Sequence, residues 1–185
     1  MSVKNLLKGK LLISEPSILN DRSFNRSVIY LTEDNMEGSV GFIINKTTDF
    51  VLNDLIPDIN CSFKIYNGGP VEQENLYFIH KIPELIPNSI EISNGIFWGG
   101  DFEVLTNLLN KEKVNQSDIR FFLGYSGWTE NQLKEELSES NWVVVENKYP
   151  DLLGLKGDDI WKNQLIKLGG EYQIWANAPK NPSLN

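Results

Sequence analysis

Residues 120–137 read Arg-Phe-Phe-Leu-Gly-Tyr-Ser-Gly-Trp-Thr-Glu-Asn-Gln-Leu-Lys-Glu-Glu-Leu, and this stretch carries the clearest signals of the fold. The apolar run Phe121–Leu123 predicts a short strand covered on both faces. Gly124 and Gly127 come next and predict a turn, because glycine adopts backbone angles that other residues resist. Thr129, with a glutamine three residues later and leucines at four-residue spacing, predicts the start of an amphipathic helix. We therefore expect a strand, a glycine turn and a helix in succession.

The rest of the chain contains many short β-forming runs joined by turn signals, and fewer helical patterns. Strands are expected at 11–13, 27–31, 40–44, 63–66, 76–80, 90–92, 95–98 and 142–145. A loop is expected at 45–50, a turn at 67–70, and further helices at 101–110 and 158–168. Consecutive strands with short connections favour an antiparallel sheet. Helices that cluster late in the chain favour the α+β class over alternating α/β.

The length and composition fit one domain with a sizeable core. The chain has 185 residues, of which 41% are hydrophobic, and we interpret residues 1–185 as one domain with about three packed helices and with frayed ends at 1–8 and 179–185. A formal net charge of −8 argues against a surface for direct nucleic-acid binding. The single cysteine, Cys61, excludes an internal disulfide, and no apolar run is long enough for a signal peptide or a membrane span. We predict a cytoplasmic protein that does not insert into membranes.

One pattern suggests a hydrolase. Ser126 lies between a predicted strand and a predicted helix, as the nucleophile does in the Gly-x-Ser-x-Gly elbow, but the last position of that pattern is Trp128 here. A serine nucleophile also needs a base, and His80 is the only histidine. A Ser126–His80 pair is therefore the alternative that we keep. The more economical interpretation is a small residue in a crowded turn and a structural histidine.

Other candidate sites are weaker. The turn Asn67-Gly68-Gly69-Pro70 could offer backbone N–H groups to an anion, but it lacks the lysine and hydroxyl residue of a phosphate loop. One histidine and one cysteine do not supply a typical zinc site. We therefore assign no catalytic residue, no metal and no cofactor.

The order of several motifs resembles the YqgE/AlgH family of bacterial proteins. The matching pieces are 9–12, Asp21, Phe24, Arg26–Val28, Gly38–Asn45, Gly68–Val71, Gly124–Trp128 with Gln132 and Leu133, and Asn141–Trp142. The resemblance implies a bifurcated, largely antiparallel sheet curled into a pseudo-barrel. It supplies no catalytic residues, and some members carry a transcriptional-regulator label. This chain departs from the usual family pattern at Thr47, Ser126 and Asn131.

We interpret the chain as a non-enzymatic binding or regulatory module that acts through a protein or small-molecule partner. The sequence does not specify that partner or the oligomeric state. Residues in the motif turns are the candidates to contact a ligand, because they fall at predicted strand ends. These candidates are Asn45, Asn67, Gly68, Gly69, Gly124, Ser126, Trp128 and Gln132.

Overall fold

The computed structural model describes residues 6–18, 21–157 and 159–178. The strands are β1 (Leu11–Ser14), β2 (Val28–Asp34), β3 (Gly38–Ile43), β4 (Thr47–Val51), β5 (Lys64–Asn67), β6 (Val71–His80), β7 (Ile90–Ser93), β8 (Ile96–Trp98), β9 (Ile119–Thr129) and β10 (Trp142–Val145). The helices are α1 (Leu52–Leu55), α2 (Phe102–Asn110), α3 (Glu130–Ser138), α4 (Asp159–Leu168) and α5 (Tyr172–Ala176), with a short 3₁₀ helix at Pro16–Ile18.

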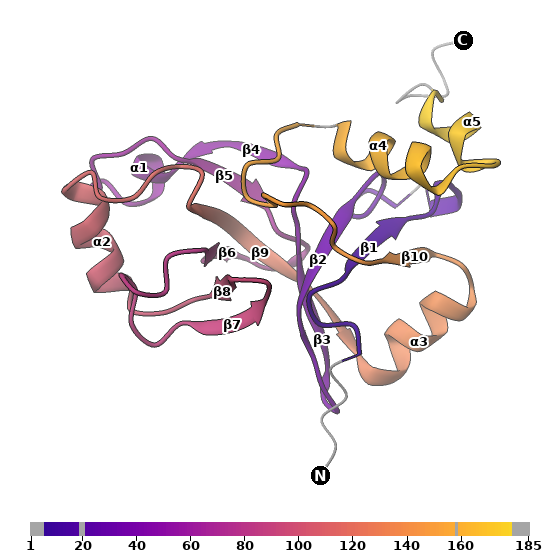
Figure 1. Cartoon of the computed structure of the whole chain (residues 1–185), viewed down its shortest axis with the longest axis horizontal. Helices are drawn as coiled ribbons and strands as arrows, with labels where there is room; N and C mark the ends of the chain where they lie inside the picture. The colour runs from indigo at the N-terminus through magenta and orange to yellow at the C-terminus, as the bar shows by residue number, and fades with distance from the viewer. Residues whose placement is uncertain (1–5, 19–20, 158, 179–185) are drawn as a thin grey trace.

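Strand β9 connects the two halves of the molecule (Figure 1). The strands follow the order β10-β1-β2-β3-β9-β6-β8-β7, and every neighbouring pair on this path is antiparallel. Strand β5 pairs with β9 in parallel along residues 121–123, whereas β3 pairs with β9 along residues 126–129. The sheet therefore branches along β9, and within the described residues its end strands β10 and β7 do not pair, so it stays open. These features confirm the predicted α+β class with a bifurcated, largely antiparallel sheet.

Three apolar clusters fill the spaces between the sheet and the helices. In β1, Leu11 and Ile13 belong to the cluster that contains α4, whereas Leu12 faces the cluster of α3. In β9, Phe121 belongs to the cluster of α2, while Phe122 joins the α4 cluster. Both strands are thus covered on both faces, as their uninterrupted apolar runs predict. Figure 1 shows the resulting layers, with α4 and α5 on one side of β1 and β2 and α3 on the other.

The glycine turn predicted after Phe121–Leu123 is wrong, because β9 continues through both glycines as far as Thr129. The reason lies in the chain that follows β5, which passes directly against β9. A Cβ atom on Gly68 would be 2.2 Å from the Gly124 oxygen, and one on Gly69 would be 2.3 Å from the Tyr125 carbonyl carbon. These glycines allow two backbone segments to touch, which sequence alone does not distinguish from a turn.

The predicted loop at 45–50 is also wrong, since Thr47–Val51 forms strand β4. Among the described residues, strand β4 pairs with β5 alone and has no buried residue, so its sequence lacks the apolar signal of a core strand. Besides the three longer helices α2, α3 and α4, the described residues form the short helices α1 and α5, which have four and five residues. The predicted helix starts at 101 and 129 are confirmed: Asp101 and Thr129 accept hydrogen bonds from the N–H groups of Val104 and Gln132.

The frayed ends predicted at 1–8 and 179–185 lie largely outside the described residues. Within them, the Leu7 N–H donates to Asp34 Oδ2 at 3.1 Å, and Lys8 Nζ donates to the Glu91 oxygen at 2.9 Å. Residues 7 and 8 are therefore hydrogen-bonded to the sheet. The predicted helix cap at Asp158 also lies outside the described residues.

Candidate functional site

Five of the eight candidate residues meet where the chain after β5 crosses β9. The Ser126 hydroxyl is fully buried and donates to the Gly68 oxygen at 3.0 Å. The Asn67 Oδ1 atom accepts from the Gly69 N–H at 3.2 Å. Gly124 adopts a φ of +68°, which is accessible to glycine at little cost, and its Cα lies against Gly69 and Val71. In this structure the polar atoms of the crossing hold the two segments together.

Two further candidates are joined through Glu136, which lies in the second half of α3. The Trp128 indole N–H donates to Glu136 Oε2 at 2.9 Å, and Gln132 Nε2 donates to Glu136 Oε1 at 3.0 Å. Both candidates also line an open groove of about 380 Å³ between the β2–β3 hairpin and the end of β9. Two acidic residues of the hairpin, Glu33 and Glu37, also line this groove.

The eighth candidate, Asn45, stabilises the end of the β2–β3 pair. Its Oδ1 accepts from the Val28 N–H and its Nδ2 donates to the Arg26 oxygen, both at 2.8 Å. The side chain is 4% exposed, so its amide completes a buried backbone junction. Asn45 also borders a cavity of about 250 Å³ next to α4.

The histidine and the serine of the hydrolase alternative lie far apart. His80 is paired with Ile119, at the start of β9, and Ser126 lies seven residues further along that strand. At about 3.3 Å per residue these seven residues span about 23 Å of the strand, which is far beyond hydrogen-bond reach. The His80 Nδ1 accepts from the Ile82 N–H and Nε2 donates to the Gly99 oxygen, which fixes a neutral tautomer. Burial lowers the pKa of His80 below its usual value, opposed by the Gly99 hydrogen bond and by the charge of Glu84.

The most unusual buried polar group is Arg120, which the sequence interpretation did not select. Its guanidinium is 3% exposed and lies over the Tyr66 ring, with 4.2 Å between Cζ and the ring centroid. Nη1 donates to the Ile44 oxygen at 2.7 Å, and Nη2 donates to the oxygens of Leu153 and Leu155 at 2.7 and 2.5 Å. Arg120 therefore joins β9, the end of β3 and the segment before α4.

Arg120 forms no ion pair with a carboxylate in the part of the chain that the structure describes. Burial lowers its pKa, and the Tyr66 hydroxyl and Asp151 act in the opposite direction. The guanidinium nevertheless stays protonated at neutral pH, because its usual pKa is far above that range. Backbone carbonyl dipoles are thus the main compensation for a buried positive charge.

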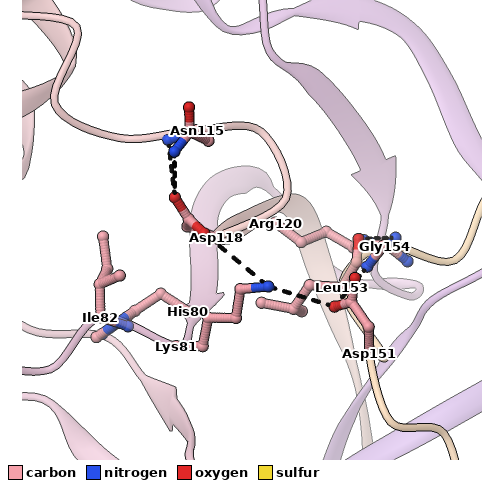
Figure 2. A network of polar contacts seen from close by, with 9 residues as sticks. All are labelled: His80, Lys81, Ile82, Asn115, Asp118, Arg120, Asp151, Leu153 and Gly154. Atoms are coloured by element: carbon pink, nitrogen blue, oxygen red, sulfur yellow. Dashed lines mark hydrogen bonds and ion pairs between the residues drawn. The ribbon is translucent and has the colours of Figure 1, made fainter.

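Asp151, an acidic group whose charge influences Arg120, has hydrogen-bond and ion-pair partners of its own (Figure 2). Its Oδ1 accepts from the Gly154 N–H at 3.1 Å and lies 3.5 Å from Lys81 Nζ. Lys81 Nζ also lies 3.9 Å from Asp118, whose other oxygen accepts two hydrogen bonds from Asn115. This network connects the end of β6, the α2–β9 loop and the segment before α4, next to Arg120.

Arg120 also lines a pocket of about 360 Å³. Its walls comprise Tyr66 and Ile119 from the sheet and residues 153–157 from the segment before α4. Two exposed lysines, Lys64 and Lys156, also line the pocket, and no aspartate or glutamate does. Chemically, the arrangement offers positive charge and N–H donors beside apolar surface. Such a pocket can bind and orient a ligand.

Metal and membrane features can be described briefly. No group of three or more His, Cys, Asp or Glu side chains that could hold a metal ion occurs among the described residues. No helix in the same residues is both long enough and apolar enough to span a membrane.

None of the eight candidate residues lines the Arg120 pocket. A signal for it was present in the sequence, because Arg120 interrupts the apolar run Ile119–Leu123. A charged residue inside a strand covered on both faces needs buried partners, which makes it a functional candidate. The carbonyl partners 33 to 76 residues away could not be read from the sequence.

Comparisons with known proteins agree on one family. The model of a family described as AlgH-like matches residues 11–173. A UPF0301 protein of Cytophaga hutchinsonii is 38% identical, and the alignment covers 97% of this chain and all of the relative. A UPF0301 protein of Bacteroides thetaiotaomicron is 41% identical, and the alignment covers 96% of this chain and 91% of the relative. The solution structure of the AlgH protein from Pseudomonas aeruginosa superposes with a TM-score of 0.74 at 23% identity over 97% of both chains. A crystal structure from Corynebacterium diphtheriae gives a TM-score of 0.75 at 19% identity, over 96% of this chain and 95% of the other. At these identities the two structures support the fold alone.

Proposed function

The chain belongs to the AlgH-like family, and from the geometry around Arg120 we propose that it is a non-enzymatic module that binds a small molecule. The regulatory role suggested by the family resemblance would then be exerted through a partner in the cytoplasm, with the ligand as the signal. The observation that carries the proposal is a buried arginine, 3% exposed and without a carboxylate in ion-pair range among the described residues, in the wall of a pocket of about 360 Å³.

Burial of the charge supports a binding role because it is costly. A charged group removed from water loses its hydration, and carbonyl dipoles replace only part of it. An apolar residue in β9 would fill the same space with less electrostatic cost, as Phe121 and Phe122 do beside it. A guanidinium in the pocket wall is the kind of placed polar group that orients a ligand in a mostly apolar site.

The segment before α4 adds a route from ligand to partner. Residues 153–157 form one wall of the pocket, and Arg120 and Asp151 hold this segment by hydrogen bonds to Leu153, Leu155 and Gly154. The same segment leads into α4, which packs on β1. A ligand that contacts Arg120 would therefore act on an element at the molecular surface.

A direct action on DNA is the less favoured form of regulation. The net charge of −8 opposes approach to a phosphate backbone. We expect no sequence-dependent shift of duplex DNA in a gel assay at about 0.15 M salt. A sequence-dependent complex that persists through a salt titration would replace the indirect mechanism with a direct one.

The hydrolase alternative remains the second candidate, and its two residues are readily tested. The Ser126 hydroxyl donates a hydrogen bond to a backbone oxygen, and both ring nitrogens of His80 form hydrogen bonds with backbone groups. We expect Ser126→Ala and His80→Gln to leave any ester hydrolysis by the purified protein at the wild-type level. Loss of a measurable activity in both variants would favour hydrolysis over the binding role.

The binding proposal is tested with the full chain labelled with ¹⁵N and a library of small fragments. We expect a subset of compounds to shift the backbone amides of residues 153–157 and of Arg120, and to raise the melting temperature. A library in which no compound shifts these amides, while others shift the groove beside Trp128 and Gln132, would move the site to that groove. Absence of binding anywhere would contradict the proposal.

A further inference from the structure

We propose that the pocket beside Arg120 is an anion site that accepts a small molecule with a carboxylate or phosphate group attached to an apolar body. This inference rests on the proposed binding function and specifies its ligand class. It depends on the charges, the available donors and the shape of the pocket.

The charge of the pocket is the first argument. Three cationic residues line the pocket, namely Arg120, Lys64 and Lys156, and no acidic residue is among the lining residues. The chain as a whole carries a charge of −8, so this concentration of positive charge runs against the overall composition. The ammonium groups of Lys64 and Lys156 have no hydrogen-bond or ion-pair partner within residues 6–18, 21–157 and 159–178.

Unused donors are the second argument. A guanidinium has five N–H donors, and Arg120 uses three of them on Ile44, Leu153 and Leu155. Its other two donors have no partner in the described structure, although the side chain is 97% buried. Side chains at the pocket edge add more donors without a partner in the same residues, namely those of Thr47, Gln116 and Ser117. Donors of this kind are satisfied together by an oxyanion, which accepts several hydrogen bonds at once.

The shape of the pocket defines the remainder of the ligand. Tyr66, Ile119 and Leu153 supply apolar surface next to the guanidinium. The Tyr66 ring already carries Arg120 on one face, which keeps the guanidinium plane fixed. A volume of about 360 Å³ suits a metabolite of modest size and excludes a folded macromolecular partner from this pocket.

The experiment compares charged and neutral probes of the same shape on the full-length protein. Phenyl phosphate and benzoate are titrated against phenol and benzyl alcohol, with the amide shifts of Gly154 and Gly157 as the readout. We expect at least one anion to bind about tenfold more tightly than its neutral analogue. Binding of phenyl phosphate alone identifies a phosphate site, and binding of benzoate alone identifies a carboxylate site.

The exposed lysines make better variants than Arg120, whose replacement is expected to destabilise the fold. We expect Lys64→Glu with Lys156→Glu to weaken anion binding by about tenfold or more. The matched control is Lys111→Glu with Lys113→Glu, which changes the net charge equally at exposed positions outside the lining. Equal loss in both double variants would show nonspecific attraction and overturn the anion site.

The anion inference and the binding function fail in different ways. If the neutral probes shift Gly154 and Gly157 as strongly as the anions do, the anion inference is overturned and the binding function stands. If neither the probes nor the fragment library shifts any amide of the protein, both are overturned.

Discussion

The Gly124 Cα faces the carbonyl oxygen of Gly69 so closely that a Cβ atom added to Gly124 would lie 2.6 Å from it. Both atoms belong to backbone, which cannot rotate away as a flexible side chain can. Gly124 lies in β9, and Gly69 belongs to the chain that crosses β9 between β5 and β6. The branch in the sheet therefore depends on the absence of a side chain at this point.

This contact predicts a large cost for Gly124→Ala. Gly169 is a matched control, because its φ of +76° is close to the +68° of Gly124 and no atom lies within 4 Å of its virtual Cβ. Gly169→Ala should lower the free energy of unfolding by about 1–2 kcal/mol, because only backbone strain is added. Gly124→Ala should lower the free energy of unfolding by roughly 3 kcal/mol or more, because the steric clash adds to the same backbone strain. Urea denaturation of both variants measures the difference, and equal losses would contradict the close crossing.

The crossing also shows how far sequence could predict this fold. Local patterns located most strands and the starts of α2 and α3, because those signals lie within a few residues. The continuation of β9 through Gly124 could not be predicted, because the reason is a segment 55 residues earlier in the chain. Local glycine chemistry and a long-range backbone contact give the same sequence signal.

The candidate site was predicted less well than the fold, for a related reason. Motif residues such as Ser126 and Asn45 attract attention because they are polar residues among apolar ones. In the structure each satisfies a buried backbone group. Arg120 also donates to buried backbone oxygens. Its pocket, however, is formed by residues 64–66, 116–120 and 153–157, which only the folded chain brings together.

Replacement of Arg120 by methionine should destabilise the fold. The change preserves most of the buried volume but leaves the oxygens of Ile44, Leu153 and Leu155 without their donor. An unsatisfied buried group costs about 1–3 kcal/mol, so we expect a net loss of about 3 kcal/mol after relief of the buried charge. Urea denaturation gives the value. The control Lys64→Met, at an exposed position of the same pocket, should change stability by less than about 0.5 kcal/mol. A variant as stable as the wild type would show that Arg120 does not anchor the segment before α4.

Glu136 should stabilise the junction of α3 with the sheet. Its Oε2 accepts from the indole N–H groups of both Trp128 and Trp142, at 2.9 and 2.7 Å. Glu136→Ala removes this shared acceptor and should cost about 2 kcal/mol, whereas Glu136→Gln retains one carbonyl acceptor and should cost less. The exposed neighbour Glu135 is the control, and Glu135→Ala should have little effect. Thermal unfolding followed by tryptophan fluorescence compares the three variants, and an equal effect of the two alanine variants would refute the shared role.

His80 should make the folded state less stable in mild acid. Burial holds its pKa below the usual value of 6.5, so the ring stays neutral in the folded chain while the unfolded chain takes up a proton. Because the unfolded state then binds more protons, stability should be complete above about pH 6.5 and fall below it, with a slope of at most about 1.4 kcal/mol per pH unit. The measurement is the free energy of unfolding in urea between about pH 7 and 5, above the range in which most carboxylates titrate.

The chain has one histidine, so the source of this slope can be assigned by a single substitution. In His80→Gln the amide can still donate toward the Gly99 oxygen but does not titrate. The variant should be less stable than the wild type at pH 7, and its stability should depend less on pH between 7 and 5. If the two proteins keep the same slope, the pH dependence has a source other than His80, and His80 titrates alike in both states.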